Sequence, residues 1–123
     1  MLVTADVTGL FTNTPQDEGA QCTEDALNND AHVKTSPMFL VRLLEIIQEY
    51  NIFEFNGELY QQKIGSGMGQ KHVPPYINIF MAKKLDTKIE ELSKKYIQQG
   101  INPLRFLKHL LDDLFLIFYG STK

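Results

Sequence analysis

FLKHLLDDLFLIFY, residues 106–119, sets two adjacent carboxylates, Asp112 and Asp113, in the middle of an otherwise apolar, strand-like run. An ionised carboxylate that is buried without a partner carries a large desolvation cost, so the pair must face water in a turn or meet a cation. The apolar flanks predict two strands, which makes the acidic pair the tip of a β-hairpin. A hairpin tip is a rigid place from which to present oxygen ligands to a metal ion.

Length and composition favour one soluble globular domain. The chain has 123 residues, of which 43% are hydrophobic and 22% are charged, enough for one compact core. Its single cysteine, Cys22, has no internal disulfide partner, and no cysteine–histidine spacing is typical of zinc, so we expect a reducing, intracellular setting. No signal peptide or membrane span is visible in the sequence, so we expect no membrane partner. The sequence does not indicate whether the protein is located in the nucleus or in the cytoplasm.

The net charge of −3 conceals a difference between the two halves of the chain. Residues 1–60 carry 10 acidic and 2 basic side chains, whereas residues 61–123 carry 5 acidic and 10 basic side chains. The basic second half is compatible with binding a phosphate backbone, but a domain that binds nucleic acid by itself usually has a stronger basic face. If nucleic acid is the partner, most of the binding surface lies elsewhere.

The start of the chain predicts a strand followed by a helix. β-branched residues dominate LVTADVT, residues 2–8, which predicts a strand that carries Asp6. Taken alone, such an aspartate is more often a turn or cap residue than a metal ligand. Thr14 and Pro15 then predict the N-cap and first residue of a helix that runs to about Asn28.

A second helix and a hairpin are predicted next. Ser36 and Pro37 repeat the cap-plus-proline pattern. The i, i+3, i+4, i+7 spacing of apolar residues predicts the stripe that this helix buries, namely Leu40, Leu43, Leu44 and Ile47. Two strand-like runs, residues 52–55 and 58–61, flank Asn56-Gly57, which is the favoured dipeptide of a two-residue hairpin turn.

Residues 64–71, IGSGMGQK, contain three glycines in five residues. Glycine lets the backbone approach a neighbour closely and adopt positive φ. The segment is neither a dinucleotide fingerprint nor a Walker loop, because Gln70 stands where either pattern would have its last glycine. Taken alone it is a flexible linker or a tight turn. Pro74 and Pro75 then introduce a long helix.

Together these elements predict an α+β fold in which an antiparallel sheet has helices packed on one face. If the strand that carries Asp6 lies beside the last hairpin, Asp6 and Asp112 come together. Like-charged carboxylates at that separation repel, and divalent cations are the usual way to hold them together. A ligand set made only of oxygen atoms favours Mg²⁺ or Mn²⁺.

In three segments that occur in the right order, the chain resembles the palm of a reverse transcriptase, most closely that of Penelope-like retroelements. Residues 4–15, TADVTGLFTNTP, are similar to the first catalytic motif of that family. Residues 64–69 through 74–81 are similar to its glycine loop and following helix, and residues 106–115 to its paired-aspartate motif. The resemblance covers nearly the whole chain and implies a palm-like antiparallel sheet.

The resemblance implies an RNA-directed DNA polymerase, a nucleotidyltransferase that uses two Mg²⁺ or Mn²⁺ ions. It makes Asp6 and Asp112 the bridging metal ligands, Asp113 a secondary ligand and the carbonyl of Val7 a further ligand. The implied partners are a nucleic-acid primer–template and deoxynucleotides, bound by the full-length retrotransposon protein.

The resemblance also implies a nucleotide-binding surface. Phe11 corresponds to the aromatic residue that lies under the sugar, where a bulky ring blocks a 2′-hydroxyl and favours deoxynucleotides. Gly67, Met68 and Gly69 would line the floor of the nascent base pair.

The chain departs from the family at Leu110, where an aromatic residue is usual, and at Val73 and Ile77, where alanine is usual. Val73 and Ile77 add volume beside the glycine loop. Counterparts of the fingers, the later palm strands, the thumb and an endonuclease domain are not found in the 123 residues. We therefore expect residues 1–123 to be one partial palm domain, a fragment that is inactive in isolation.

Two other interpretations stay open. One is a catalytically inert retroelement remnant or protein-interaction module, which self-associates through apolar surface that the missing domains would cover. The other is a metal-dependent phosphohydrolase, which ranks last because it explains neither Phe11 nor the glycine loop.

Overall fold

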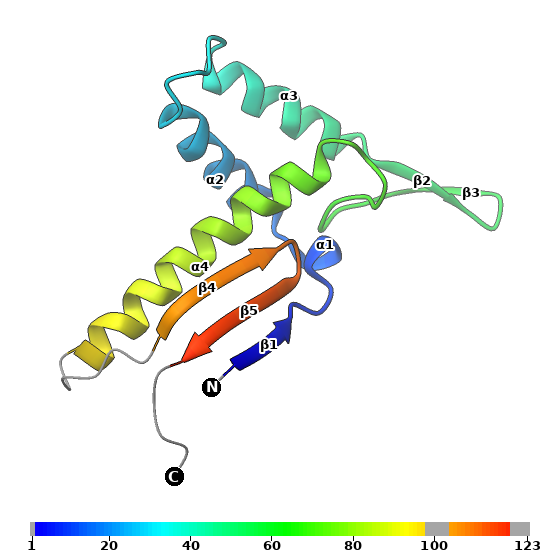
Figure 1. The fold of residues 1–123 in the computed structure, drawn as a ribbon. Coiled ribbons are helices and arrows are strands. Elements are labelled where there is room, and N and C mark those ends of the chain that lie inside the picture. Colours follow the sequence, from blue (N-terminus) through cyan, green and yellow to red (C-terminus); the bar gives the residue numbers. More distant parts are fainter. Residues whose placement is uncertain (1, 98–103, 119–123) are drawn as a thin grey trace. The chain divides into compact units, whose positions relative to one another are not determined.

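The structure is a computed structural model that describes residues 2–97 and 104–118 (Figure 1). The chain divides into two compact units, each described by itself. Unit 1 comprises Met1–Thr8 and Met81–Lys123, and unit 2 comprises Gly9–Phe80. Helices are combined with a small antiparallel sheet, which confirms the predicted mixture of helices and antiparallel strands. The expectation of a single domain remains a prediction.

Unit 1 contains a three-stranded antiparallel sheet. Its strands, in spatial order, are β1 (Leu2–Asp6), β5 (Asp113–Phe118) and β4 (Leu104–Leu110). β4 and β5 are joined by a turn of two residues, Leu111 and Asp112. Both the strand that carries Asp6 and the acidic hairpin are confirmed, while Tyr119 of the predicted hairpin lies outside the described residues.

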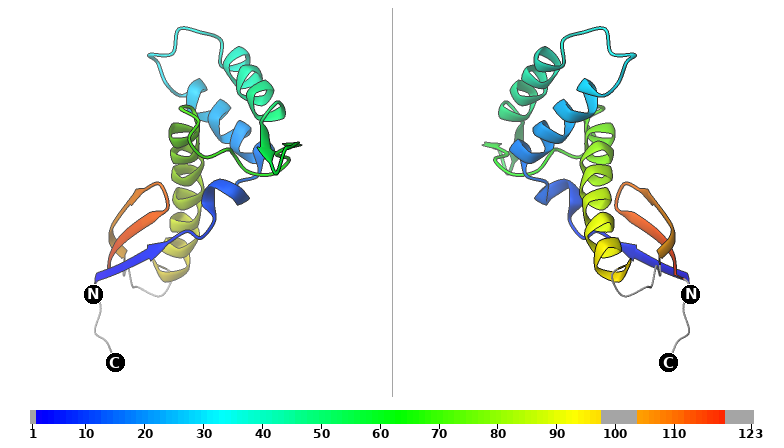
Figure 2. Two further views of the ribbon diagram at one scale, coloured as in Figure 1. Left: turned by 90° about the vertical axis from the view of Figure 1, so that its right-hand side faces the viewer. Right: turned by 90° about the vertical axis from the view of Figure 1, so that its left-hand side faces the viewer.

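The two faces of this sheet differ in their surroundings. Along β5, Leu114, Leu116 and Phe118 are half-buried, whereas the alternate residues are exposed. This period of two is typical of a strand with one covered face. The helix α4 spans Val73–Ile97, and its part from Met81 onward belongs to unit 1. Figure 2 shows this part running along one side of the sheet. The opposite face, which carries Asp113, Phe115 and Ile117, is exposed in the described part of the chain, and we call it the open face.

Unit 2 contains three helices, a β-hairpin and the start of α4. These elements are α1 (Leu10–Asn13), α2 (Gln16–Asn28), α3 (Pro37–Glu49), β2 (Ile52–Phe55) and β3 (Glu58–Gln61). α2 and α3 pack against each other. The predicted hairpin is confirmed, with positive φ at both turn residues, +54° at Asn56 and +80° at Gly57, as its tight turn requires.

The prediction that Thr14 caps α2 is wrong. The short helix α1 precedes it, and the Thr14 hydroxyl donates a hydrogen bond of 2.6 Å to the carbonyl of Leu10. The N-cap residue of α2 is Pro15, so the helix starts one residue later than predicted. Because Thr14 is only 2% exposed, its hydroxyl must find a partner inside the protein, and the carbonyl four residues back provides one.

The predicted buried stripe of α3 is also largely wrong. The buried residues of this helix are Val41, Leu44 and Gln48, while Leu43 is 43% exposed and Ile47 is 46% exposed. The helix carries apolar residues on most of its circumference, so the spacing of apolar residues does not single out one face. Packing in the folded unit selects the face instead.

The core of unit 2 is centred on the first turns of α4. Ile77 is 0% exposed, Val73 is 1% exposed and Tyr76 is 3% exposed. α2 approaches this helix through Gly19, because a Cβ atom there would lie 1.8 Å from the Tyr76 hydroxyl. The extra volume of Val73 and Ile77 therefore fills a core. Within the described ranges no helix, α4 included, is both long and apolar enough to cross a bilayer.

Candidate functional site

The first group of predicted site residues forms the acidic corner of unit 1, which we define as Asp6, Val7, Asp112 and Asp113. The register of β1 and β5 pairs Asp6 with Asp113. The backbone N–H of Val7 donates a hydrogen bond of 2.9 Å to the carbonyl of Asp112. Asp6 and Asp113 are thus a non-hydrogen-bonded cross-strand pair, in which Cα atoms lie about 4.5 Å apart and side chains share one face.

The two adjacent aspartates occupy different places in the hairpin. Asp112 is half-buried in the turn, whereas Asp113 is the first residue of β5 and is exposed, like Asp6. The predicted pairing of strands is therefore confirmed, but the residue directly opposite Asp6 is Asp113. Leu111 holds this tight turn with a φ of +54°. A left-handed conformation costs a residue with a side chain about 1–2 kcal/mol, so the position of Asp112 depends on local backbone strain.

The acidic corner fits a divalent cation in the type of its donors, which are all oxygen atoms. Oxygen ligands are those that Mg²⁺ and Mn²⁺ prefer. Among the described residues, no group of three or more histidine, cysteine, aspartate or glutamate side chains is arranged to hold a metal ion. Asp6 and Asp113 supply a pair, and a third carboxylate would require the Asp112 side chain to turn toward them.

We expect Asp113→Asn to raise the free energy of unfolding by about 0.2–1 kcal/mol in metal-free buffer of low ionic strength, because it removes a like-charged cross-strand pair. Urea denaturation followed by circular dichroism measures the change. Adding Mg²⁺ should stabilise the wild type and leave the variant unchanged. Asp86→Asn, on the exposed surface of α4, is the matched control. If the stability difference between the wild type and Asp113→Asn is the same with and without Mg²⁺, this pair has no role in cation binding.

The open face of the sheet has a shallow hollow of ≈ 300 Å³ beside Asp113. Thr4, Phe115 and Lys108 line it and lie in one row across the three strands. A lysine and an aromatic ring next to a carboxylate suit a ligand that carries phosphate and a planar base. Neither Lys108 nor Phe115 was predicted as a site residue, although the period of two along each strand places them on the same face as Asp113.

The second group of predicted residues lies in unit 2, where the glycine loop (residues 64–71) packs against α1. The backbone N–H of Ser66 donates a hydrogen bond of 2.8 Å to the carbonyl of Phe11. Gly65 has a φ of +74°, and a Cβ atom there would lie 2.5 Å from backbone atoms of Phe11 and Thr12. The close backbone approach that the glycines predicted is confirmed at Gly65, and it brings Phe11 to the glycine loop.

A hollow of ≈ 580 Å³ in unit 2 is lined by Gly67 and Met68, two of the predicted substrate-binding residues. Three amide side chains also line it. The Asn51 amide nitrogen donates to Gln62 at 2.9 Å, and the Gln70 amide nitrogen donates to Asn51 at 2.9 Å. Gly69, the third predicted residue, has a φ of +88°. In the sequence, Gln70 served only to exclude other glycine motifs, and this hydrogen-bond network was not predicted.

Two titratable residues follow the glycine loop. Burial lowers the pKa of His72, whose Nε2 is buried without a hydrogen-bond partner in the part of the chain that the structure describes. Burial raises the pKa of Tyr76, and the nearby Gln48 amide offsets part of that rise. Both shifts favour the uncharged side chain at neutral pH.

Comparisons with protein-family models, with curated proteins and with solved structures give no match to this chain. The resemblance to reverse transcriptases therefore rests on the three ordered motifs in the sequence. The structure assembles the acidic corner within unit 1 and joins Phe11 to the glycine loop within unit 2.

Proposed function

We propose that this chain supplies part of the palm of an RNA-directed DNA polymerase of the Penelope-like type. The observation that supports the proposal best is the pairing of β1 with β5. It brings Asp6, near one end of the sequence, to Asp112 and Asp113, near the other end. A metal site split between a first strand and a last hairpin is what the motifs imply.

Each site residue has a distinct task in this proposal. The carboxylates of Asp6, Asp112 and Asp113 and the carbonyl of Val7 would hold two Mg²⁺ or Mn²⁺ ions. When bound, the ions supply activation of the primer 3′-hydroxyl and stabilisation of the leaving pyrophosphate.

The nucleotide-binding tasks fall to residues of unit 2. Phe11, held to the glycine loop through its carbonyl, would exclude a ribonucleotide 2′-hydroxyl. Gly67, Met68 and Gly69 would form the floor of the nascent base pair.

The test is primer extension by residues 1–123 grafted into an active reverse transcriptase in place of its own palm segment. We expect Asp6→Asn and Asp112→Asn each to reduce extension by at least about a hundredfold, because each removes charge that stabilises the transition state. Asp86→Asn is the control and should leave extension unchanged. Full extension by Asp6→Asn would refute the proposal.

Metal binding by the isolated chain gives a second readout if the graft does not extend primers. Mn²⁺ should broaden the nuclear magnetic resonance signals of residues next to Asp6 and Asp113, and Asp6→Asn should abolish that broadening. Broadening that is the same in both proteins would count against the metal site.

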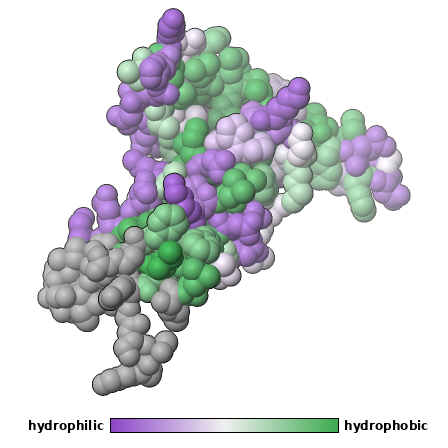
Figure 3. Space-filling model, viewed as in Figure 1, coloured by the Kyte–Doolittle hydropathy of each residue, from purple (hydrophilic) through white to green (hydrophobic). Residues whose placement is uncertain are grey.

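A protein-interaction module is the second candidate, and the β2–β3 hairpin favours it. Both strands are exposed along their whole length, and Figure 3 shows apolar side chains gathered over the hairpin. Phe53 and Tyr60 stack there with ring centroids 5.7 Å apart. Exposed apolar patches often mark interaction surfaces. In size-exclusion chromatography with a Mg²⁺ titration, a monomer that binds Mg²⁺ supports the polymerase, and an oligomer indifferent to Mg²⁺ supports the module.

A further inference from the structure

The helix α3 carries a second row of apolar side chains, opposite the face that it buries. Its buried residues, Val41, Leu44 and Gln48, lie on the face that packs within unit 2, where α2 is a neighbouring helix. At about 100° per residue, the second row lies on the far side of the helix, and its side chains are between 38% and 67% exposed. Figure 3 shows apolar side chains along α3. We call this row the outer stripe, which consists of Phe39, Leu43, Ile46 and the C-cap residue Tyr50.

The outer stripe has the spacing of a coiled-coil seam. Its residues follow one another at intervals of four, three and four positions, which is the alternation of heptad positions d and a. The 13 residues of α3 span about 20 Å, so the stripe runs along almost the whole helix. Soluble monomeric proteins rarely expose a contiguous apolar surface of this kind unless it contacts another molecule. The outer stripe is therefore suited to pack against another helix.

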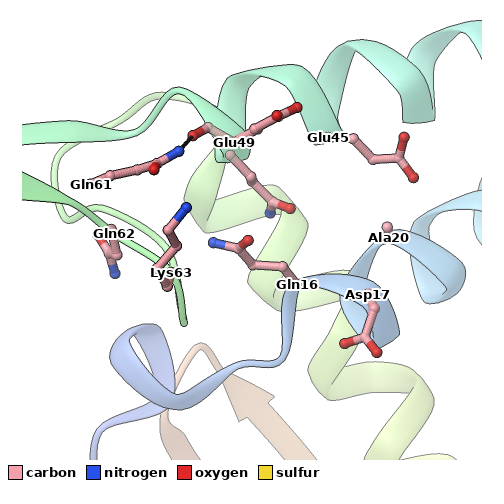
Figure 4. Close-up of a pocket in the computed structure, with 9 residues that line it drawn as sticks. Gln16, Asp17, Ala20, Glu45, Glu49, Gln61, Gln62 and Lys63 are labelled. Atoms are coloured by element: carbon pink, nitrogen blue, oxygen red, sulfur yellow. Dashed lines mark hydrogen bonds between the residues drawn. The ribbon is translucent and has the colours of Figure 1, made fainter.

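The two flanks of the outer stripe differ in character. Heptad position e, on one flank, is apolar at both Leu40 and Ile47, whereas position g, on the other flank, is charged at both Arg42 and Glu49. Arg42 meets Glu45 at 2.8 Å within the helix, and its five N–H donors allow it to bind a second carboxylate as well. Figure 4 shows Glu45 and Glu49 on α3, where they also line a pocket of ≈ 250 Å³. A partner helix must match one apolar flank and one flank that carries both a cation and a carboxylate.

A second copy of α3 that runs antiparallel to the first matches both flanks. A two-fold axis at the middle of the outer stripe sets Leu43 of each copy against Ile46 of the other. The same axis brings the two apolar flanks together and sets Arg42 of each copy beside Glu49 of the other, so two identical ion pairs form. In a parallel pair, Arg42 would instead lie beside the apolar flank of the other copy and gain no carboxylate. The charges of α3 thus favour its own antiparallel copy as the partner.

We propose that the chain forms an antiparallel, two-fold symmetric dimer through the outer stripe of α3. Two helices about 20 Å long bury less than the about 1,200 Å² of a standard interface, so the dimer is weak, with a dissociation constant in the micromolar range. The proposal does not depend on the polymerase proposal, because α3 belongs to unit 2 and the acidic corner to unit 1. A dimer that binds Mg²⁺ fits both proposals.

The test is sedimentation equilibrium of the chain at about 10–500 µM and low ionic strength, which brackets a micromolar dissociation constant. We expect an equilibrium between monomer and dimer. Leu43→Glu should weaken dimerisation at least about a hundredfold, because each copy would bury an unpaired carboxylate. Leu43 is 43% exposed in the single chain, so this variant should keep its fold, which circular dichroism checks. Mn²⁺ broadening near Asp6, which tests the polymerase proposal, should be the same in Leu43→Glu as in the wild type.

Leu59→Glu is the matched control, because it makes the same change on the exposed β2–β3 hairpin. It should dimerise like the wild type. A wild type that stays monomeric at every concentration, or a dimer that Leu43→Glu leaves intact, would overturn the proposal. Loss of the dimer in Leu59→Glu alone would assign the interface to the hairpin and would overturn it as well.

Charge reversal tests the antiparallel arrangement. Arg42→Glu and Glu49→Arg each set like charges beside one another at both ion pairs, so each variant should dimerise about tenfold more weakly than the wild type. In an equimolar mixture of the two variants, a mixed dimer regains both ion pairs, so the mixture should associate like the wild type. An effect confined to one chain cannot produce this recovery. A mixture that associates as weakly as the single variants would overturn the antiparallel pairing.

Discussion

Gly65→Ala is expected to lower the free energy of unfolding of unit 2 by about 3 kcal/mol. Two effects add at this position. The φ of +74° costs an alanine about 1–2 kcal/mol. In addition, the new Cβ atom would lie 2.5 Å from backbone atoms of Phe11 and Thr12, and a backbone cannot rotate away as a flexible side chain can. Urea denaturation followed by circular dichroism measures the loss.

Gly69→Ala is the matched control for this prediction. Its φ of +88° is equally unfavourable for alanine, but nothing lies within 4 Å of the added Cβ atom. We therefore expect a loss of about 1–2 kcal/mol from the backbone conformation alone. If both variants lose the same stability, the contact between the glycine loop and α1 is looser than the structure shows.

Ile77→Ala is expected to destabilise unit 2 by about 3 kcal/mol, within the range for deleting a large buried aliphatic side chain. Ile77 is 0% exposed and Val73, one turn earlier, is 1% exposed. Reverse transcriptases, the family that the sequence resembles, usually have alanine at both positions. The loss would show that the larger side chain is part of the core of this protein. Thermal and urea denaturation both report it.

Ile47→Ala is the control, because it removes the same atoms from a side chain that is 46% exposed. We expect a change of less than about 1 kcal/mol. The sequence spacing placed Ile47 in the buried stripe of α3, so this pair of variants also tests which face of that helix packs inward. A large loss of stability in Ile47→Ala would instead support the predicted buried stripe of α3.

Local patterns in the sequence were sufficient for the elements whose shape is decided locally. Asn56-Gly57 predicted its hairpin because few other residues tolerate positive φ at both turn positions. The acidic hairpin followed from the cost of burying two carboxylates in an apolar run. The close approach at Gly65 followed from the absence of a side chain.

Features decided by neighbours distant in sequence could not be predicted in the same way. The buried face of α3 depends on the surface against which it packs. The register that sets Asp113 opposite Asp6 depends on the pairing of β1 with β5, two strands that are far apart in the sequence. The amide network of Asn51, Gln62 and Gln70 joins two separate loops, one between α3 and β2 and the other between β3 and α4. In each case the sequence determines which side chains are present, but the tertiary fold determines which of them contact each other.

The insertion of unit 2 between Thr8 and Met81 has a consequence for the order in which the protein is made. A ribosome releases all of unit 2 before β4 and β5, and the contacts within unit 2 are available as soon as Phe80 has emerged. β1 cannot pair until β5 has been made, and the pairing must close the long loop between Asp6 and Asp113. Among the features of the described residues, the acidic corner is thus expected to form late, and synthesis that stops before β5 yields a chain without it.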